Sequence, residues 1–252
     1  MLAARLIDRL AAMPPHTTYA EVFVGMGGVF LRRPFKARAE VINDISRDVT
    51  NLFRVLQVHY VPFLDMMRFQ LTSRAEFERL SHEDPETLTD MQRAARFLYL
   101  QRTAFGGKAH GQHFGVSPTN TARFDITRLP GILEAVHDRL AGVVIERLPW
   151  DRFIPRYDRP ETLFYLDPPY FGNEGDYGPG LFHRDDFARL AAILGGLKGR
   201  FLLSLNDRPE VRALFGAFHI EAVEVSYTVA VGGGTRAHEV IISNHPPALS
   251  AP

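Results

Sequence analysis

Hydrophobic and polar residues follow two different patterns along the chain. Short apolar runs of the kind that form buried strands occur near both ends, whereas the middle of the chain lacks them. Pro14 and Pro15 end a first amphipathic helix, and Ser46 is placed to cap a later one. The elements predicted for this first section are a helix over 3–13, strands over 19–25 and 39–44, and a helix over 46–60. Strand, glycine-rich loop, strand and helix in this order indicate an α/β unit with a parallel sheet.

The second half of the chain returns to this α/β pattern after a different middle section. Residues 61–100 are predicted to be mostly helical, and residues 101–128 are irregular and polar. The elements predicted after them are a helix over 130–141, a strand and helical turn within 143–154, a strand and Pro-Pro turn within 161–170, a helix over 184–198, a strand over 201–206, a helix over 208–218, and strands over 220–231 and 237–244. We expect the last two strands to pair antiparallel. The pattern predicts one α/β domain, formed by residues 1–60 and 146–252, that carries an inserted region at 61–145.

Composition and charge narrow the class of protein. The chain has 252 residues, of which 46% are hydrophobic and 23% charged, values typical of a soluble globular protein. The absence of cysteine excludes disulfide scaffolds, thiolate metal sites and a thiol nucleophile, and it suits a reducing cytoplasm. No apolar run approaches the roughly 18–20 residues needed to span a bilayer. We therefore expect a cytoplasmic protein without a membrane segment.

A glycine-rich loop, FVGMGG at 23–28, directly follows the first predicted strand. Glycines at this place let the backbone turn tightly and approach a ligand closely. Asp44 ends the next predicted strand, nineteen residues after Gly25. In nucleotide-binding α/β folds, a carboxylate about 20 residues after the first glycine accepts hydrogen bonds from ribose hydroxyls. The loop lacks the full GxGxxG fingerprint, so the pattern alone is also compatible with a tight turn beside an exposed Asp.

The second motif is Asp167-Pro168-Pro169-Tyr170, which follows the apolar strand LFYL. Two prolines fix an extended backbone and remove two amide donors, while their carbonyls remain free to accept. In an open α/β sheet this end of a strand is the ligand-binding edge. A carboxylate, a fixed carbonyl and an aromatic ring together suit a planar group that carries an amino nitrogen.

These motifs in this order, FVGMGG, VINDIS with Asp44, and FYLDPPY, resemble those of the DNA adenine-N6 methyltransferases. The closest resemblance is to the adenine-specific subfamily whose target-recognition region lies between the glycine motif and DPPY. Many of its members are carried by phages or prophages, or serve restriction–modification. The segments FLYLQRTAFGGK and AHEVIISN are also similar to that subfamily, so the resemblance covers nearly the whole chain. It implies a Rossmann-like, S-adenosylmethionine-dependent methyltransferase fold, with a mostly parallel sheet, an antiparallel last strand and an inserted, mainly helical target-recognition region.

The resemblance also implies a role for each motif residue. S-adenosylmethionine is the implied methyl donor, and the cofactor-binding residues carried over are Phe23, Gly25, Gly27, Asp44, Ile45 and Asp167. The implied substrate is double-stranded DNA from which the target adenine is flipped. The catalytic residues carried over are Asp167, Pro168, Pro169 and Tyr170, with Tyr170 stacked on the base and the Asp167 carboxylate and Pro168 carbonyl accepting from N6. No metal is required, because the sulfonium is already an activated methyl donor.

The inserted region carries the charge expected of a DNA-binding surface, although the whole chain is neutral, with 29 basic and 29 acidic residues. Residues 91–128 contain six Lys or Arg and one Asp, a net charge of +5, whereas residues 76–90 are rich in acids. Basic residues in a glycine-rich loop favour contact with phosphates. The DNA-contact candidates are Arg102, Lys108 and Arg123.

Three interpretations remain open at this stage. The first is a monomeric DNA adenine-N6 methyltransferase. The second is amino methylation of another planar base, such as cytosine N4 or an RNA base. The third is a catalytically weak DNA-binding remnant, because family members usually have a Gly-Gly-Lys segment before the first helix and this sequence begins with Met1-Leu2-Ala3.

Overall fold

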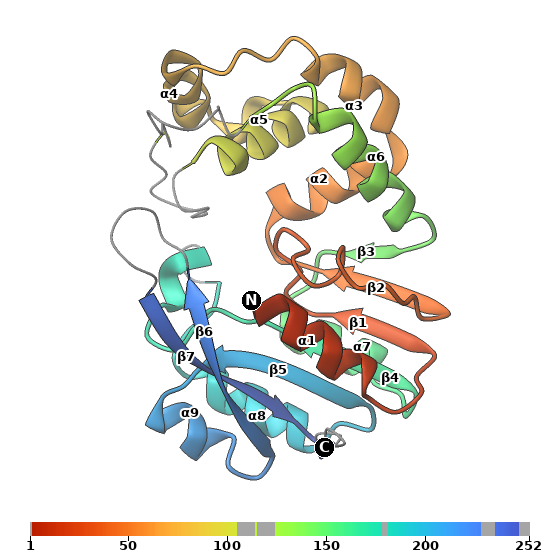
Figure 1. Cartoon of the computed structure of the whole chain (residues 1–252), viewed down its shortest axis with the longest axis vertical. Helices are drawn as coiled ribbons and strands as arrows, with labels where there is room; N and C mark the ends of the chain where they lie inside the picture. Colours follow the sequence, from red (N-terminus) through yellow and green to blue (C-terminus); the bar gives the residue numbers. More distant parts are fainter. Residues whose placement is uncertain (1, 105–113, 115–123, 178–180, 228–234, 247–252) are drawn as a thin grey trace. The chain divides into compact units, whose positions relative to one another are not determined.

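The predicted strands pair into one sheet (Figure 1). The computed structural model of the chain describes residues 2–104, 114, 124–177, 181–227 and 235–246. It divides into two compact units, one formed by Met1–Ile45 with Glu146–Pro252 and the other by Ser46–Ile145. The sheet has seven strands in the order β3-β2-β1-β4-β5-β7-β6. Their bounds are β1 Thr18–Glu21, β2 Ala39–Asn43, β3 Val144–Glu146, β4 Thr162–Leu166, β5 Arg200–Asn206, β6 His219–Tyr227 and β7 Thr235–Ser243.

Strand directions confirm the predicted fold class. β1 pairs in parallel with β2 on one side and β4 on the other, and β4 pairs in parallel with β5. β7 is antiparallel to both β5 and β6, as predicted for the last strand. The chain therefore passes from β1 to β2 in one direction and later to β4 and β5 in the other. Such a reversal of strand order is the topological switch point at which doubly wound sheets bind ligands.

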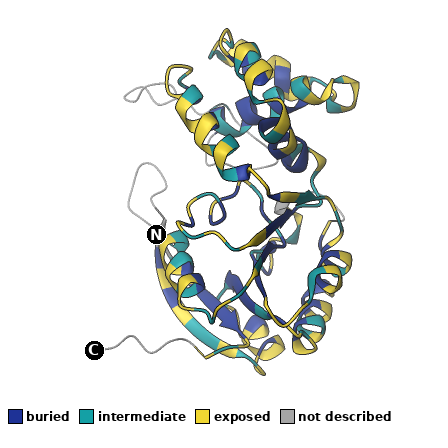
Figure 2. Ribbon diagram, turned by 90° about the vertical axis from the view of Figure 1, so that its right-hand side faces the viewer, coloured by how far each residue is buried: buried dark blue, intermediate teal, exposed yellow. Residues whose placement is uncertain are grey.

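The two faces of the sheet differ in chemistry. One face is apolar and packs against α7 (Trp150–Tyr157), α8 (Asp186–Gly195) and α9 (Pro209–Leu214) through a single buried cluster. Figure 2 shows the strands largely buried and the outer sides of the flanking helices exposed. α1 (Leu2–Ala11) lies at the other face, where Arg9 pairs with Glu221 of β6. Strand alternation places on that second face a row of buried polar residues: Tyr19, Glu21, Tyr165, Ser204 and Glu239.

The second unit is helical. Its elements are α2 Arg47–Val58, α3 Tyr60–Met67, α4 Arg74–His82, the 3-10 helix η1 Pro85–Thr87, α5 Asp90–Thr103 and α6 Leu129–Leu140. Ser46 caps α2 as predicted, because its hydroxyl accepts from the Val49 amide. No helix among the described residues is long and apolar enough to cross a membrane.

The boundary between the units differs from the predicted one at α2. The sequence pattern assigned 46–60 to the α/β domain, whereas in the structure α2 belongs to the helical unit. The cause is the apolar side of α2, which packs against α5 and α6. The Asn51 amide also donates to the Asp90 carbonyl at 2.7 Å, and the Gln57 amide donates to the Leu140 and Val143 carbonyls. α2 directly follows β2 in sequence, yet it belongs to the helical unit, so sequence order alone does not determine which unit a helix joins.

Candidate active site

The glycine loop begins where β1 ends, and backbone hydrogen bonds fix its course. The Val22 amide donates to the Tyr165 carbonyl of β4, and the Val24 amide donates to the Asn43 carbonyl of β2. Gly25 and Gly27 have φ values of +49° and +72°, a region in which glycine alone is unstrained. A Cβ added at Gly25 would meet nothing within 4 Å. The backbone here is therefore open to close approach by a ligand.

The end of β2 meets this loop through Asp44. The Gly25 amide donates to Asp44 Oδ2 at 2.9 Å, so the two residues that the sequence pattern paired are in contact. The preceding Asn43 is buried and acts as a brace. Its amide donates to the Val22 and Leu148 carbonyls, and its Oδ1 accepts from the Leu148 amide. Ile45 follows as a half-buried residue whose carbonyl accepts from Arg147.

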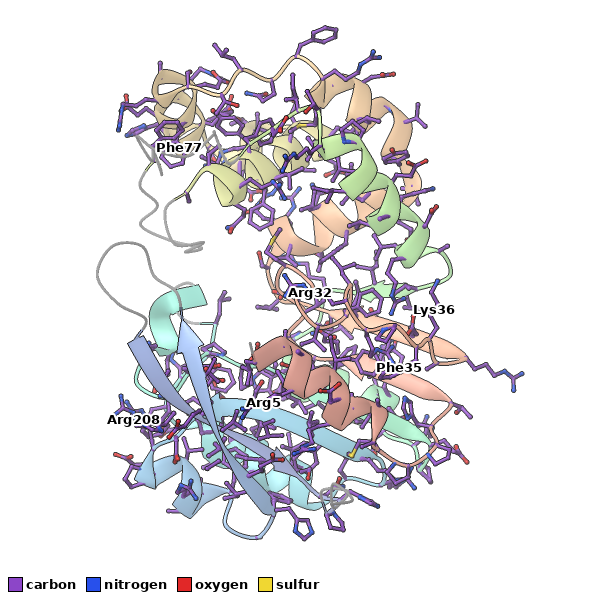
Figure 3. The ribbon with its side chains drawn as sticks, in the orientation of Figure 1. Arg5, Arg32, Phe35, Lys36, Phe77 and Arg208 are labelled. Carbon is purple, nitrogen blue, oxygen red and sulfur yellow. The ribbon has the colours of Figure 1, made fainter. Side chains whose placement is uncertain are left out.

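The segment between the glycine loop and β2 is held by one buried arginine. Arg33 pairs with Glu40 and stacks on Tyr19, with its guanidinium carbon 3.6 Å from the ring centroid. Phe35 covers the same guanidinium at 4.7 Å. Arg32 and Lys36, labelled with Phe35 in Figure 3, are exposed on this segment. Arg33 thus fixes the backbone that leads from the glycine loop into β2.

DPPY begins directly after β4, the strand beside β1. Because Glu21 pairs with Tyr165, Asp167 follows at the same sheet edge as the glycine loop. Asp167 Oδ1 accepts from the Ser204 hydroxyl at 2.9 Å. Pro168 and Pro169 are buried, and Asp167 and Tyr170 are half-buried. The motif is therefore a rigid, mostly buried segment whose two functional side chains remain partly accessible.

Burial changes the protonation of two carboxyl groups near this edge. It raises the pKa of Asp167 to about 6; the Ser204 hydrogen bond acts against this rise, and the negative Glu239 adds to it. Burial also raises the pKa of Glu21 to about 8, although the Tyr19 hydroxyl at 2.6 Å opposes the rise. Asp167 is thus predominantly ionised at neutral pH, whereas Glu21 remains predominantly protonated.

The chain after Tyr170 is held by Asn206 of β5. The Asn206 amide donates to the Phe171 carbonyl at 2.9 Å, and its Oδ1 accepts from the Phe171 amide at 2.9 Å. Phe171 is buried, and Arg184 lies over its ring at 3.9 Å. This two-point bond fixes the residue next to Tyr170, and hence the direction in which DPPY leaves the sheet.

Aromatic side chains support both motifs from the apolar face of the sheet. Phe23 and Tyr170 pack against the same buried cluster. Phe23 meets Phe182 edge-on with ring centroids 6.0 Å apart, and Phe182 also contacts Trp150 and Phe187. The glycine loop and DPPY thus share one hydrophobic support.

Two basic residues of segment 91–128, Arg93 and Arg96, are bonded to partners within the helical unit. Arg93 is buried and bonds to Asp48 and Glu86, and Arg96 donates to the Leu80 carbonyl. Arg102 is half-buried near the end of α5. Lys108 and Arg123 lie outside the described residues. Phe77 of α4, labelled in Figure 3, is buried within the same unit. The net charge of a segment therefore overstates the charge that it presents to a partner.

The geometry brings together three chemical features at one edge of the sheet. These are an open glycine turn beside a carboxylate, a predominantly ionised Asp167 next to a fixed carbonyl, and a half-buried tyrosine ring. Sequence reasoning missed the polar residues that hold them: Asn43, Tyr165, Ser204 and Asn206. The one available signal was a pair of polar residues, Ser204 and Asn206, spaced two apart at the end of the apolar strand FLLSLN.

Comparison with known proteins gives consistent matches. The sequence model of the family described as D12 class N6 adenine-specific DNA methyltransferase matches residues 4–229. A type II methyltransferase of Paramecium bursaria Chlorella virus NC1A is 22% identical and covers 89% of this chain and 86% of its own length. A type II methyltransferase of Lactococcus lactis subsp. cremoris is 23% identical, with 90% and 86% covered. The DNA N-6-adenine-methyltransferase of Escherichia phage P1 is 25% identical over 91% of this chain, which spans 32% of that longer protein.

Proposed function

Since the chain belongs to the D12 class of N6 adenine-specific DNA methyltransferases, we propose that the sheet edge at β1 and β4 is its active site. The observation that carries this proposal is the placement of the glycine loop and DPPY on adjacent parallel strands at the switch point of the sheet. Family membership favours adenine N6 over the other base amino groups that the sequence pattern left open.

The residues around the glycine loop suit S-adenosylmethionine. Asp44 holds the ribose hydroxyls, Ile45 packs on the adenine of the cofactor, and Phe23 with Gly25 and Gly27 passes beside its methionine part. Two observations support this fit: the open space beside Gly25, and a carboxylate fixed through the Gly25 amide. When bound, S-adenosylmethionine supplies a methyl group activated by its sulfonium.

The DPPY residues act on the target base. We assign Tyr170 to stacking on an adenine flipped out of double-stranded DNA, which reaches this pocket only after leaving the helix. The Asp167 carboxylate and the Pro168 carbonyl accept hydrogen bonds from the two N6–H groups. Because the adenine N6 lone pair is delocalised into the ring, these two hydrogen bonds favour a more pyramidal, more nucleophilic nitrogen. Asp167 performs this role only while ionised, so its pKa of about 6 sets the lower limit of the active pH range.

The helical unit is proposed to contact DNA as a target-recognition region. Arg102, Lys108 and Arg123 are the assigned phosphate contacts. Replacing Arg102 by Ala should lower the slope of log Kobs against log salt by about 0.9 for the lost phosphate contact. Arg68→Ala, which removes an exposed cation paired with Asp65, is the matched control and should leave that slope unchanged.

We further propose that the enzyme is a monomer and that it acts in the cytoplasm, where DNA and S-adenosylmethionine are both present.

Two substitutions test the assigned site. Asp44→Asn should weaken equilibrium binding of S-adenosylmethionine by about tenfold or more, because a charge-assisted hydrogen bond is lost. Asp185→Asn, which changes an exposed carboxylate on the same unit, should not weaken it. Asp167→Asn should abolish methyl transfer to DNA in a protein that unfolds at no lower temperature than the wild type, because the substitution removes a buried negative charge. Normal transfer by Asp167→Asn would show that the base pocket is elsewhere.

A further inference from the structure

A chain of buried hydroxyls ends on Asp167. The Ser204 hydroxyl of β5 lies 2.9 Å from Asp167 Oδ1, and the Tyr165 hydroxyl of β4 lies 3.0 Å from Ser204 Oγ. Ser204 is 0% exposed and Tyr165 is 1% exposed. The register explains the contact: Leu166 pairs with Leu203, so the next residues on the two strands, Asp167 and Ser204, lie side by side.

The number of hydroxyl hydrogens available determines which group donates in each hydrogen bond of this series. Ser204 has one hydroxyl hydrogen, and an ionised Asp167 is an acceptor only. When Ser204 donates to Asp167, the Tyr165 hydroxyl must donate to Ser204. The alternative acceptor for Ser204, the Leu166 carbonyl, is farther away at 3.4 Å. The arrangement that satisfies all three side chains therefore points both hydrogens toward the Asp167 carboxylate.

The surroundings of Asp167 otherwise oppose its negative charge. Glu239 of β7 raises the pKa of Asp167, and burial raises it further. Glu21 of β1 interacts electrostatically with both Asp167 and Tyr165. Tyr19 and Arg33 in turn interact with Glu21. Arg33 is the one cation in this group, and it pairs with Glu40. Among the residues that the structure describes, Ser204 thus provides the side-chain hydrogen bond that directly favours the ionised form of Asp167.

We propose that Ser204 is a positioning residue for Asp167, supported by Tyr165, which holds Oδ1, keeps the carboxylate ionised, and leaves Oδ2 to accept from adenine N6. This inference rests on the proposed role of Asp167. It assigns to β5 a part in the reaction that lies outside both the glycine loop and DPPY.

The pH profile of methyl transfer tests the inference. In Ser204→Ala, single-turnover transfer at saturating DNA and S-adenosylmethionine should lose about half or more of its rate at neutral pH and regain it at higher pH. The acid limb should shift upward by about one to two pH units, the effect of one hydrogen bond to a charged group. Ser204→Thr keeps the hydroxyl and should restore the wild-type limb. Loss of activity by an equal factor at every pH would indicate a merely structural role and overturn the proposal.

A second variant guards against misfolding of the first. Tyr165→Phe keeps the ring and removes the hydroxyl behind Ser204, so the acid limb should shift in the same direction by a smaller amount. Tyr157→Phe is the matched control, because its hydroxyl bonds to Glu146 at 2.7 Å, away from Asp167, and the limb should not move. If neither Ser204→Ala nor Tyr165→Phe moves the limb while Asp167→Asn is inactive, this inference is wrong and the proposed function stands. If Asp167→Asn is active, the proposed function itself fails.

Discussion

Glu21 makes the stability of the α/β unit depend on pH in an unusual direction. The side chain is 1% exposed, and burial raises its pKa to about 8, from 4.5 as an ordinary carboxyl. Between these two pH values the folded state holds a proton that the unfolded state has released. Stability therefore falls as pH rises from about 4.5 to about 8. At about 1.4 kcal/mol per pH unit, the stability loss from this group reaches at most about 5 kcal/mol.

Glu21→Gln removes this titration while keeping the side-chain shape and an oxygen for the Tyr19 hydroxyl. Relative to the wild type, the variant should gain about 4 kcal/mol of unfolding free energy between pH 5 and pH 9, because part of the wild-type loss has already occurred below pH 5. Urea unfolding across this range, followed by tryptophan fluorescence, measures the gain. The chain has a single tryptophan, the buried Trp150, so the signal reports on the α/β unit.

A control separates the buried carboxyl from general effects of charge. Glu224→Gln removes an exposed carboxylate from β6 of the same unit and should give a difference from the wild type that does not vary with pH. A constant difference between Glu21→Gln and the wild type over pH 5–9 would refute the argument that Glu21 is buried in its neutral form.

Three further substitutions test how the site and the helical unit are held. Gly25→Ala should destabilise the fold by about 1 kcal/mol in urea unfolding, because its φ is +49°, and should weaken cofactor binding, whereas Gly28→Ala should do neither. Asn206→Leu leaves the Phe171 amide and carbonyl without their partner, and should cost about 2–3 kcal/mol and lower the single-turnover rate. Arg93→Met breaks bonds to two carboxylates, and should lower the stability of the helical unit by about 2 kcal/mol in circular dichroism while the tryptophan transition stays in place.

The sequence predicted those parts of the site that depend on local pattern. Glycines after a strand permit the positive φ values of a tight turn, and two prolines after a strand restrict the backbone to an extended path. The place of both motifs at a sheet edge therefore follows from the motifs themselves. The spacing paired Gly25 with Asp44, and the structure brings the two into contact because a loop followed by a parallel strand returns Asp44 to the same edge. The mostly parallel sheet followed from the alternation of strand and helix patterns, and the antiparallel last strand followed from the run of glycines at 232–234 between two strand patterns.

Long-range partners could not be predicted in this way. Ser204 is 37 residues from Asp167, and only the register of β4 against β5 makes them neighbours. Arg93 and Arg96 contribute to a basic segment in the sequence, but tertiary packing gives them carboxylate and carbonyl partners within the helical unit. The apolar stripe of α2 indicated a buried face without indicating which surface would cover it. The period of the apolar residues determines which side of a helix is buried, whereas tertiary packing determines which element covers that side.

We propose above that this chain methylates adenine N6 in DNA, with the Asp167 carboxylate accepting a hydrogen bond from one N6–H group. The most direct test incubates the protein with labelled S-adenosylmethionine and unmethylated double-stranded DNA, then digests the DNA and identifies the labelled nucleoside. The account predicts N6-methyladenine as the labelled product for the wild type and no label for Asp167→Asn. Label in N4-methylcytosine, or label in N6-methyladenine that persists in Asp167→Asn, would contradict it.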